Sequence, residues 1–313
     1  MVICKTVTAL RQYLSSRPPG SRLGFIPTLG ALHDGHASLI REAKAGGRFT
    51  VCSVFVNPTQ FNDPTDFEKY PKTLDQDILL LEKNGTDVLF LPSVGEIYPE
   101  GTVLTKHYDL GSLETVLEGA YRPGHFQGVC QVVERLLRIV APDDLYMGQK
   151  DYQQCMVVRR LIELESLPVT LVVCPIRREP DGLAMSSRNL RLDAAHRAGA
   201  GAIHEVLELI KTHFAEARAA ASPHAREARA AQTQDGASQT RPPQSAPLAL
   251  APLKAEGRDI LESKGFRVDY VDIADATTLR LLDSWDGREG AVALVAAFWG
   301  GVRLIDNEIL NLS

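Results

Sequence analysis

Two histidines spaced three positions apart offer the clearest chemistry in this sequence. His33 and His36 end the run PTLGALHDGH, which directly follows a short apolar run that we expect to be a strand. A helix is expected to begin near Asp34, and a helix start presents backbone N–H groups and the positive dipole end to an anion. Imidazole N–H groups on one face of that first turn can donate to phosphate oxygens as charge develops. The run predicts a phosphate-transfer site; a tight turn with two surface histidines is the plainer alternative.

Two further polar segments follow later expected strands. Asn57 and Gln60 lie in the run VNPTQF, and Lys150 and Asp151 lie in the run MGQKDYQQ. In an open α/β sheet the ligand crevice lies beyond the carboxyl ends of the strands. Amide side chains there suit a polar substrate, Lys150 offers a compact cation for phosphate, and Asp151 suits a ribose hydroxyl. Each segment alone could be an ordinary turn or helix start, but their shared position favours one site.

The run DGLAMSSRN offers a fourth group of phosphate ligands. Ser186, Ser187 and Arg188 combine two hydroxyls with a guanidinium on a loop that starts with glycine, and such groups bind polyphosphate by charge-assisted hydrogen bonds. We expect this loop at the junction of two domains, where it could close over a nucleotide. A capped helix start is the alternative.

Three other residues carry open interpretations. His125 and Arg122, in the run EGAYRPGHF, fit functional and structural roles equally well. Asp77 could be an outer ligand for Mg²⁺, although a solvated position on a helix is the simpler interpretation. The sequence has no G-x-x-x-x-G-K-[ST] run and no Cys/His cluster, so it indicates neither a P-loop nor a structural zinc site.

Composition limits the class of protein. The chain has 313 residues, of which 44% are hydrophobic and 23% charged, with a net charge of −5. This balance is typical of a globular protein and gives no electrostatic reason to expect a nucleic-acid partner. No segment approaches the ~20 apolar residues of a membrane span. Five scattered cysteines without CxxC spacing indicate a reducing compartment, so we expect a cytoplasmic protein.

Apolar runs and helical patterns alternate in the first half of the chain. This alternation predicts an α/β fold, a Rossmann-like parallel sheet with crossover helices. The expected strands cover residues 23–26, 50–56, 88–91, 145–147 and 169–173. The expected helices cover residues 34–45, 74–83, 129–140 and 152–163.

The second half has a different pattern. One helix face from 203 to 214 and strands near 266–270, 292–298 and 302–305 predict a smaller α+β domain. We place the domains at 1–178 and 179–313. An Ala- and Pro-rich stretch, 222–252, cannot bury enough apolar surface to fold alone, so it is expected to be a disordered insertion.

Taken together, the segments resemble the pantoate–β-alanine ligase (pantothenate synthetase) family of the HxGH nucleotidylyltransferases. The similarity covers essentially the whole chain, in the order PTLGALHDGH, FVNPTQF, DFEKYPKTLDQD, LEGAYRPGHFQGV, MGQKDYQQ, DGLAMSSRN and RLIDN. Seven runs in sequence are far more specific than any one. The resemblance implies two steps: pantoate and ATP give pantoyl adenylate and pyrophosphate, and β-alanine then displaces AMP to give pantothenate.

The resemblance also implies roles for individual residues. His36 would be the acid, His33 a phosphate ligand, Lys150 the stabiliser of charge and Arg188 a ligand of the polyphosphate. Gln60 and Gln154 would bind pantoate, and Gln60 would also lie near β-alanine; Asn57 remains a substrate candidate from its position after the expected strand. The residues implied in ATP binding are Leu29, Gly30, Ala31, Leu32, His33, Asp34, Gly35, His36, Gly148, Gln149, Lys150, Asp151, Arg177, Met185, Ser186, Ser187 and Arg188.

Mg²⁺, carried mainly by the ATP phosphates, and a homodimer are implied as well. Leu29 stands where the family usually has Met, and Arg177 where a smaller apolar residue usually lies beside the adenine. Two rivals remain open at this point. Another HxGH nucleotidylyltransferase would retain the nucleotide in its product rather than release AMP, and a non-catalytic nucleotide-binding regulator would not need His33, His36, Lys150 and Arg188 together.

Overall fold

The computed structural model describes residues 1–61, 67–104, 106–220 and 247–311. The chain divides into two compact units, Met1–Leu192 and Asp193–Ser313. In the described part of the chain, no helix has the length and apolar character that a membrane crossing requires.

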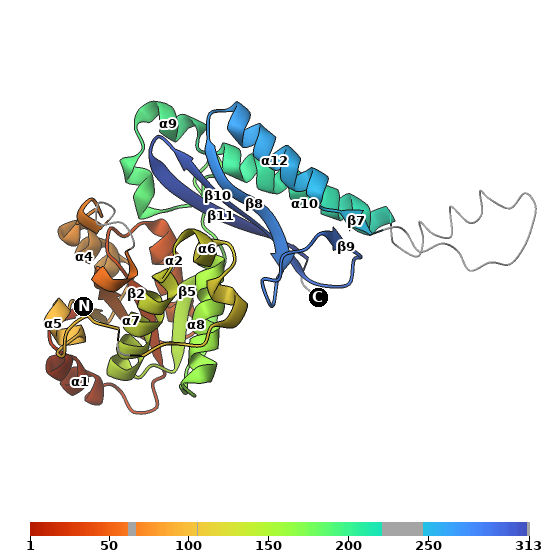
Figure 1. Ribbon diagram of the computed structural model, residues 1–313. Helices are drawn as coiled ribbons and strands as arrows, with labels where there is room; N and C mark the ends of the chain where they lie inside the picture. The colour runs from red at the N-terminus through yellow and green to blue at the C-terminus, as the bar shows by residue number, and fades with distance from the viewer. Residues whose placement is uncertain (62–66, 105, 221–246, 312–313) are drawn as a thin grey trace, which may run out of the picture. The chain divides into compact units, whose positions relative to one another are not determined.

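The first unit is built on a sheet flanked by helices (Figure 1). The sheet has six strands in the order β1-β4-β3-β2-β5-β6. Each neighbouring pair is parallel, which confirms the predicted Rossmann-like α/β fold. The strands are β1 (Val2–Cys4), β2 (Leu23–Thr28), β3 (Phe49–Val54), β4 (Val88–Phe90), β5 (Asp144–Gly148) and β6 (Thr170–Cys174).

Helices connect these strands. The bounds of α2 and α4 agree with the helical patterns in the sequence, whereas α7 begins four residues earlier than predicted, after Gly124 in a left-handed conformation (φ 79°). The α-helices are α1 (Val7–Ser15), α2 (Asp34–Ala45), α4 (Leu74–Lys83), α5 (Val94–Ile97), α6 (Glu118–Tyr121), α7 (His125–Val140) and α8 (Tyr152–Leu164). The 3-10 helices are η1 (Pro58–Gln60), η2 (Gly111–Glu114), η3 (Gln149–Asp151) and η4 (Ser187–Arg191).

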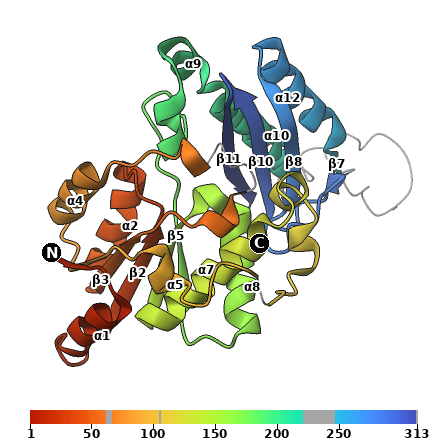
Figure 2. The ribbon, with the colours of Figure 1, turned by 60° about the vertical axis from the view of Figure 1, so that its left-hand side comes forward.

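Both faces of the sheet are covered (Figure 2). Side chains alternate along a strand, so Phe25 packs in a core with α1, α5, α7 and α8, and its neighbour Ile26 packs in a second core with α2 and α4. Both side chains are fully buried. Coverage on both faces explains why these strands read as continuous apolar runs.

The strand order places a switch point between β2 and β5. From β2 the chain adds β3 and β4 on one side, and then returns to add β5 and β6 on the other. Loops leaving the carboxyl ends of adjacent strands diverge at such a point and form a ligand crevice between them.

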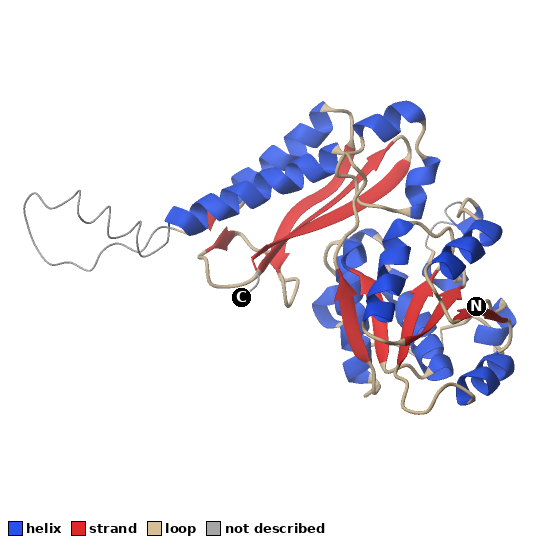
Figure 3. Ribbon diagram, turned by 180° about the vertical axis from the view of Figure 1, so that it is seen from behind, coloured by secondary structure: helices blue, strands red, loops and turns tan. Residues whose placement is uncertain are grey.

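The second unit confirms the predicted α+β pattern. Strands β8 (Arg267–Asp275), β10 (Ala291–Trp299) and β11 (Val302–Asn311) form an antiparallel sheet in the order β11-β10-β8. Helices α10 (Ala202–Ala220) and α12 (Ala251–Ser263) pack along it (Figure 3). The unit also contains α9 (Ala194–Gly199) and a two-stranded ladder of β7 (Leu248–Ala249) and β9 (Ser284–Trp285).

Two predicted boundaries differ from the structure. The domain boundary after residue 178 lies too early, because the segment that follows it belongs to the first unit: Ser187 Oγ donates to the carbonyl of Ala31 at 2.9 Å. The expected insertion at 222–252 lies outside the described residues as far as 246. Its last residues are wrongly included, because β7 pairs with β9 and α12 begins at Ala251.

Candidate active site

Three of the predicted segments leave neighbouring strands. The loop with His33 and His36 follows β2, the loop with Gln60 follows β3, and Lys150 follows β5. Strands β3 and β5 flank β2 on its two sides. The structure therefore brings these segments to one edge of the sheet, at its switch point.

The two histidines lie side by side at the start of α2, with ring centroids 4.1 Å apart. His33 is the N-cap of the helix rather than part of its first turn. Its Nδ1 accepts the N–H of Gly35 at 3.2 Å, and Nδ1 of His36 accepts the N–H of His33 at 3.3 Å. Because Nδ1 acts as an acceptor in each neutral ring, the proton lies on Nε2. Each imidazole therefore presents an N–H donor at its other end.

Both histidines are neutral at physiological pH in this structure. Burial, followed by the charge of Lys150, lowers the pKa of His33 to about 4. Burial, followed by His33 and Lys150, lowers the pKa of His36 well below its ordinary value. Lys150 therefore acts on both rings, and the three side chains form one electrostatic group.

Backbone N–H groups of this loop contribute less than the sequence predicts. The N–H groups of His33 and Gly35 bond to the histidine rings. Those of Ala31 and Leu32 donate to the Asp77 carboxylate at 3.0 and 2.7 Å. For these four residues, the expectation that free amides await an anion is wrong, because side chains of the protein already bind them.

Asp77 is neither a solvated helix residue nor placed as an outer metal ligand. Its side chain is 1% exposed, and Thr73 Oγ1 adds a third donor at 3.0 Å. Three protein donors therefore occupy a carboxylate that we expected to face water or Mg²⁺. Asp77 instead holds the loop that follows β2.

The loop after β6 is itself tightly built. Ser187 is buried and bonds to Ala31, whereas Ser186 Oγ caps η4 by accepting the N–H of Arg188 at 3.3 Å. Met185 donates its N–H to the carbonyl of Arg177, whose side chain is exposed. In the structure, the two serines fix the loop to itself and to the β2 loop.

Asn57 occupies a buried position, with no exposed surface. Its Oδ1 accepts the hydroxyl proton of Tyr98 at 2.8 Å and the N–H of Thr59 at 3.3 Å. Its Nδ2 donates to Gln60 Oε1 at 3.1 Å and to the carbonyl of Gly128 at 3.3 Å. The predicted substrate contact of Asn57 is therefore not what the structure shows. Asn57 orients the Gln60 amide, so that its Nε2 end is turned away from Asn57.

His125 fixes the backbone of the same turn. Its Nδ1–H donates to the carbonyl of Gln60 at 2.8 Å, and its Nε2 accepts from Arg122 at 3.0 Å. Burial, followed by the charge of Arg122, lowers the pKa of His125 to about 3; Arg188 acts in the same direction. Of the two roles left open by the sequence, the structure supports positioning of Gln60.

Gly128 allows α7 to approach this turn closely. A Cβ atom added to Gly128 would lie 2.2 Å from the carbonyl oxygen of Thr59 and 3.0 Å from Cα of Gln60. Glycine to alanine in a helix interior ordinarily stabilises by about 1 kcal/mol. We expect Gly128→Ala instead to lower the melting temperature. We also expect it to raise the KM for the substrate that Gln60 binds about tenfold, since displacement of a ligating group by a fraction of an ångström loses its hydrogen bond. Thermal unfolding and steady-state kinetics would measure both.

Gly95→Ala is the matched control for that substitution. Gly95 lies within α5, and its added Cβ would meet no atom closer than 3.9 Å. We expect this variant to keep its KM and its melting temperature or to gain stability. If Gly128→Ala and Gly95→Ala had the same KM and melting temperature, the role assigned to the close approach of α7 to Thr59 and Gln60 would be wrong.

Lys150 and Gln154 follow the carboxyl end of β5. Gly148 ends the strand, Lys150 lies in η3, and its Nζ is 3.5 Å from the Asp151 carboxylate, with the lysine side chain 18% exposed. Gln154 is partly exposed in the first turn of α8. Its neighbour Gln153 is 2% exposed; it accepts the backbone N–H of Glu118 and donates to the carbonyl of Leu113. The structure thus separates a Gln available to a ligand from a structural one.

Three residues that support the site were missed in the sequence. Tyr98 anchors Asn57, Thr73 donates to Asp77, and the Tyr70 hydroxyl lies 3.5 Å from the carbonyl of Gly30. Tyr70 and Thr73 lie in the YPKT segment, whose polar residues could have indicated a role. Tyr98 has no such signal, because its partner is 41 positions away.

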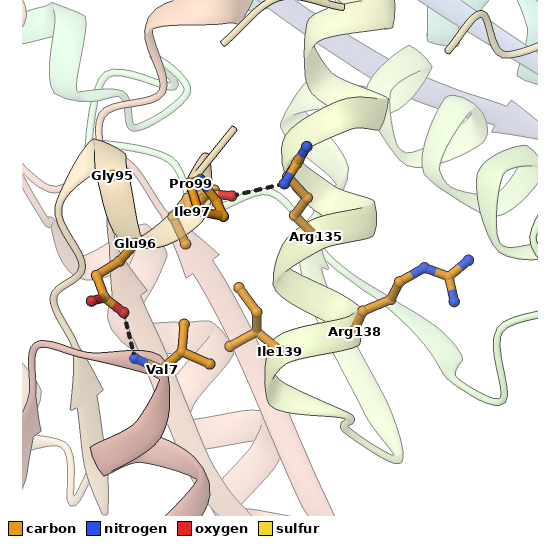
Figure 4. Close-up of a pocket in the computed structure, with 8 residues that line it drawn as sticks. All are labelled: Val7, Gly95, Glu96, Ile97, Pro99, Arg135, Arg138 and Ile139. Atoms are coloured by element: carbon orange, nitrogen blue, oxygen red, sulfur yellow. Dashed lines mark hydrogen bonds between the residues drawn. The ribbon is translucent and has the colours of Figure 1, made fainter. Parts of the chain in front are cut away.

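A cavity of about 430 Å³ lies elsewhere in the first unit, between α1, α5 and α7 (Figure 4). None of the predicted site residues lines it. Arg135 donates to the carbonyl of Ile97 there, and Glu96 accepts the N–H of Val7. The lining residues are Val7, Gly95, Glu96, Ile97, Pro99, Arg135, Arg138 and Ile139.

Comparisons with known proteins identify the family. The model of the pantoate-beta-alanine ligase family matches residues 2–309. A pantothenate synthetase of Porphyromonas gingivalis is 42% identical over 308 residues, 98% of each chain, and one of Bacteroides thetaiotaomicron is 41% identical over the same length and coverage.

Solved structures agree. The crystal structure of the pantothenate synthetase of Thermus thermophilus has a TM-score of 0.80 and 38% identity, covering 99% of each chain. That of the pantoate-beta-alanine ligase of Francisella tularensis, complexed with beta-gamma ATP and beta-alanine, has a TM-score of 0.74 and 33% identity, covering 100% of this chain and 99% of that one. The chain therefore belongs to the pantoate–β-alanine ligase family.

Proposed function

We propose that this enzyme joins pantoate to β-alanine with ATP, through pantoyl adenylate, at the site formed by the loops after β2, β3 and β5. Pantothenate, AMP and pyrophosphate are the products. The observation that carries the residue assignments is the pair of neutral imidazoles, both acted on by Lys150, at the switch point of the sheet. The relative from Francisella tularensis, whose structure contains beta-gamma ATP and beta-alanine, supports the choice of ligands.

In the first step a carboxylate oxygen of pantoate attacks the α-phosphorus of ATP. A phosphorus–oxygen bond forms, the bond to pyrophosphate breaks, and the leaving group takes the negative charge. Lys150 and Arg188 stabilise that charge, and Nε2–H of His33 and His36 donates to phosphate oxygens. His36 acts as a neutral hydrogen-bond donor rather than as an imidazolium acid, because its pKa is lowered by burial.

Binding positions follow the loops. Gln60 and Gln154 hold pantoate, with Gln60 presenting its N–H₂ end since Asn57 binds its oxygen. Gly148, Gln149 and Asp151 hold the ribose and phosphates. We assign the remaining nucleotide contacts to the loops after β2 and β6, at Leu29, Gly30, Asp34, Arg177, Met185 and Ser186. The amides of Ala31, Leu32 and Gly35 and the hydroxyl of Ser187 already bond within the protein, so these residues shape the two loops.

In the second step the amine of β-alanine attacks the acyl carbon of the adenylate. The new C–N bond replaces the bond to the AMP oxygen, which leaves with the bonding electrons, and the amine releases a proton to solvent. No enzyme nucleophile is required. The protein aligns the amine, through Gln60, and protects the mixed anhydride from water; we propose that the second unit acts as a lid for this purpose.

Mg²⁺ enters with the nucleotide in this proposal. Among the described residues, no group of three or more His, Cys, Asp or Glu side chains could hold a metal ion, and the Asp77 oxygens bind protein donors. We therefore assign the ion to the ATP phosphates, because Mg²⁺ in nucleotide-dependent enzymes is held mainly by substrate phosphates and waters, with few protein ligands. A homodimer is proposed from the family resemblance, and a cytoplasmic location from the scattered cysteines without CxxC spacing.

The test is release of pyrophosphate by purified protein with ATP and Mg²⁺. We expect release only when pantoate is present, and pantothenate and AMP once β-alanine is added. Pyrophosphate release without pantoate, or a product that retains the nucleotide, would favour a different nucleotidylyltransferase. Absence of release with both substrates would refute the proposal.

A further inference from the structure

We propose that Asp77 is a positioning residue for the reaction: its carboxylate holds residues 30–32 in a strained conformation that sets the orientation of His33 and His36. The inference rests on the proposed role of these histidines. In this role the Asp77 carboxylate binds backbone N–H groups of the protein, rather than a metal ion or solvent. Four observations carry it.

The first is the backbone of the loop. Gly30 has φ 85° and Ala31 has φ 50°, so two successive residues are left-handed. This conformation is sterically strained for Ala31, because its Cβ atom crowds the backbone, whereas glycine has no Cβ atom. Such strain persists only where surrounding contacts enforce it. A Cβ on Gly30 would lie 3.1 Å from Val54 and 3.2 Å from Asp77 Oδ2, so the loop also lies tightly against its neighbours.

The second is the bonding of the Asp77 carboxylate. Oδ2 accepts the N–H of Ala31 at 3.0 Å, and Oδ1 accepts the N–H of Leu32 at 2.7 Å and the hydroxyl of Thr73 at 3.0 Å. Hydrogen bonds to an ionised group are about twice as strong as neutral ones. The two consecutive amides bond to different oxygens of the carboxylate, whereas an amide side chain has only one oxygen.

The third is that the carbonyl groups of the same loop are held separately. Ser187 Oγ donates to the carbonyl of Ala31 at 2.9 Å, and the Tyr70 hydroxyl lies 3.5 Å from the carbonyl of Gly30. Asp77 binds the N–H side of the loop and these two hydroxyls bind its C=O side. The strained peptides are therefore fixed in both directions.

The fourth is the connection to the imidazoles. Leu32 directly precedes His33, whose N–H donates to Nδ1 of His36. This bond sets the Nε2–H tautomer of His36. A shift of the Leu32–His33 peptide therefore moves the bond that decides which nitrogen of His36 faces a ligand.

The test is Asp77→Asn, with Asp87→Asn as the matched control. Asp87 Oδ2 also accepts a backbone N–H and a hydroxyl, both from Thr50 (2.7 and 2.9 Å), near the opposite, amino end of β3. We expect Asp77→Asn to lower kcat for pyrophosphate release about 10- to 100-fold, the loss typical of a hydrogen bond to a charged group. The Asp87 variant should keep kcat within about twofold.

A second readout separates positioning from mere stability. In protein labelled with ¹⁵N-histidine, two-bond proton–nitrogen correlations report the tautomer of each ring. We expect Nε2–H for His36 in the parent protein and in Asp87→Asn, and a mixture of tautomers in Asp77→Asn. An unchanged tautomer, or an unchanged kcat, in Asp77→Asn would overturn the proposal.

Two further outcomes are decisive. If Asp77→Asn raises only the Mg²⁺ concentration required for activity, Asp77 is a metal ligand and the proposal is wrong. If Asp77→Asn does not fold, the same measurements are made on Thr73→Val, which removes one hydrogen-bond donor to Oδ1 of Asp77. A threefold or larger loss of kcat together with a changed His36 tautomer would support the proposal. An unchanged kcat and tautomer would refute it. Failure of the proposed function would appear separately, as absence of pyrophosphate release by the parent protein with ATP and pantoate.

Discussion

Replacing Lys150 with methionine is expected to lower the turnover of pyrophosphate release at least a hundredfold, since loss of one donor aimed at developing charge costs ~10²–10³ in rate. The side chain is only 18% exposed, and its charge acts on both His33 and His36. Methionine keeps the length and the apolar stem of lysine but removes the charge. Pre-steady-state release of pyrophosphate at saturating ATP and pantoate would measure the step directly.

Lys254→Met provides the control. The Lys254 side chain is also 18% exposed and lies 2.9 Å from a carboxylate, that of Asp272, in the second unit. It therefore matches Lys150 in burial and pairing but stands outside the proposed site. We expect this variant to retain turnover within about twofold. Turnover above a tenth of the parent rate in Lys150→Met would remove this lysine from the charge-stabilising group.

Local patterns predicted the sheet and the placement of the main motifs. Apolar runs ending in polar segments located β2, β3 and β5 to within two residues, because buried parallel strands are apolar on both faces. The helical stripe of α7 was found, but its first turn was not. That turn begins after Gly124 with His125 and Phe126, and its polar members are buried by contacts with distant segments.

Roles that depend on distant partners could not be read from the sequence. Asp77 was expected in solvent because acidic residues in a helix usually are, yet its partners Ala31 and Leu32 are 46 and 45 positions away. Asn57 was expected at the ligand because its segment follows the carboxyl end of a strand, yet its closest hydrogen-bond partner is the Tyr98 hydroxyl, at 2.8 Å. Only tertiary packing decides whether a polar side chain faces a substrate or supports the residue that does.

The adjacent glutamines show where the sequence carries no signal. Gln153 is buried and lies four positions before the buried Val157, whereas Gln154 is partly exposed and lies four positions before the buried Val158. Helical periodicity therefore does not distinguish the two side chains. Only the hydrogen bonds of Gln153 to the backbone of Leu113 and Glu118 reveal its structural role.

His36→Ala is expected to lower turnover of adenylate formation at least a hundredfold, by the same loss of a charge-stabilising donor (~10²-fold). The change also removes the acceptor of the His33 backbone N–H, whereas the N–H of Gly35 still holds the His33 ring. His213→Ala is the control, because His213 also bonds through Nδ1, to the carbonyl of Leu209 within α10 of the second unit. We expect that variant to behave as the parent protein does.

The pH dependence distinguishes a neutral donor from an imidazolium acid at His36. The pKa of His33 is lowered to about 4, and that of His36 is lowered well below its ordinary value. Both rings are therefore neutral hydrogen-bond donors between about pH 6 and 8, and the neutral form of His33 is lost only as pH falls through about 4. With magnesium in excess, kcat/KM for ATP, which reports the free enzyme, should therefore not rise as pH falls from about 8 to 6. An imidazolium acid of ordinary pKa, ~6.5, would make it rise across that interval. Such a rise, absent in His36→Ala, would show that the acid role implied by the family resemblance is correct and that the neutral-donor role is wrong.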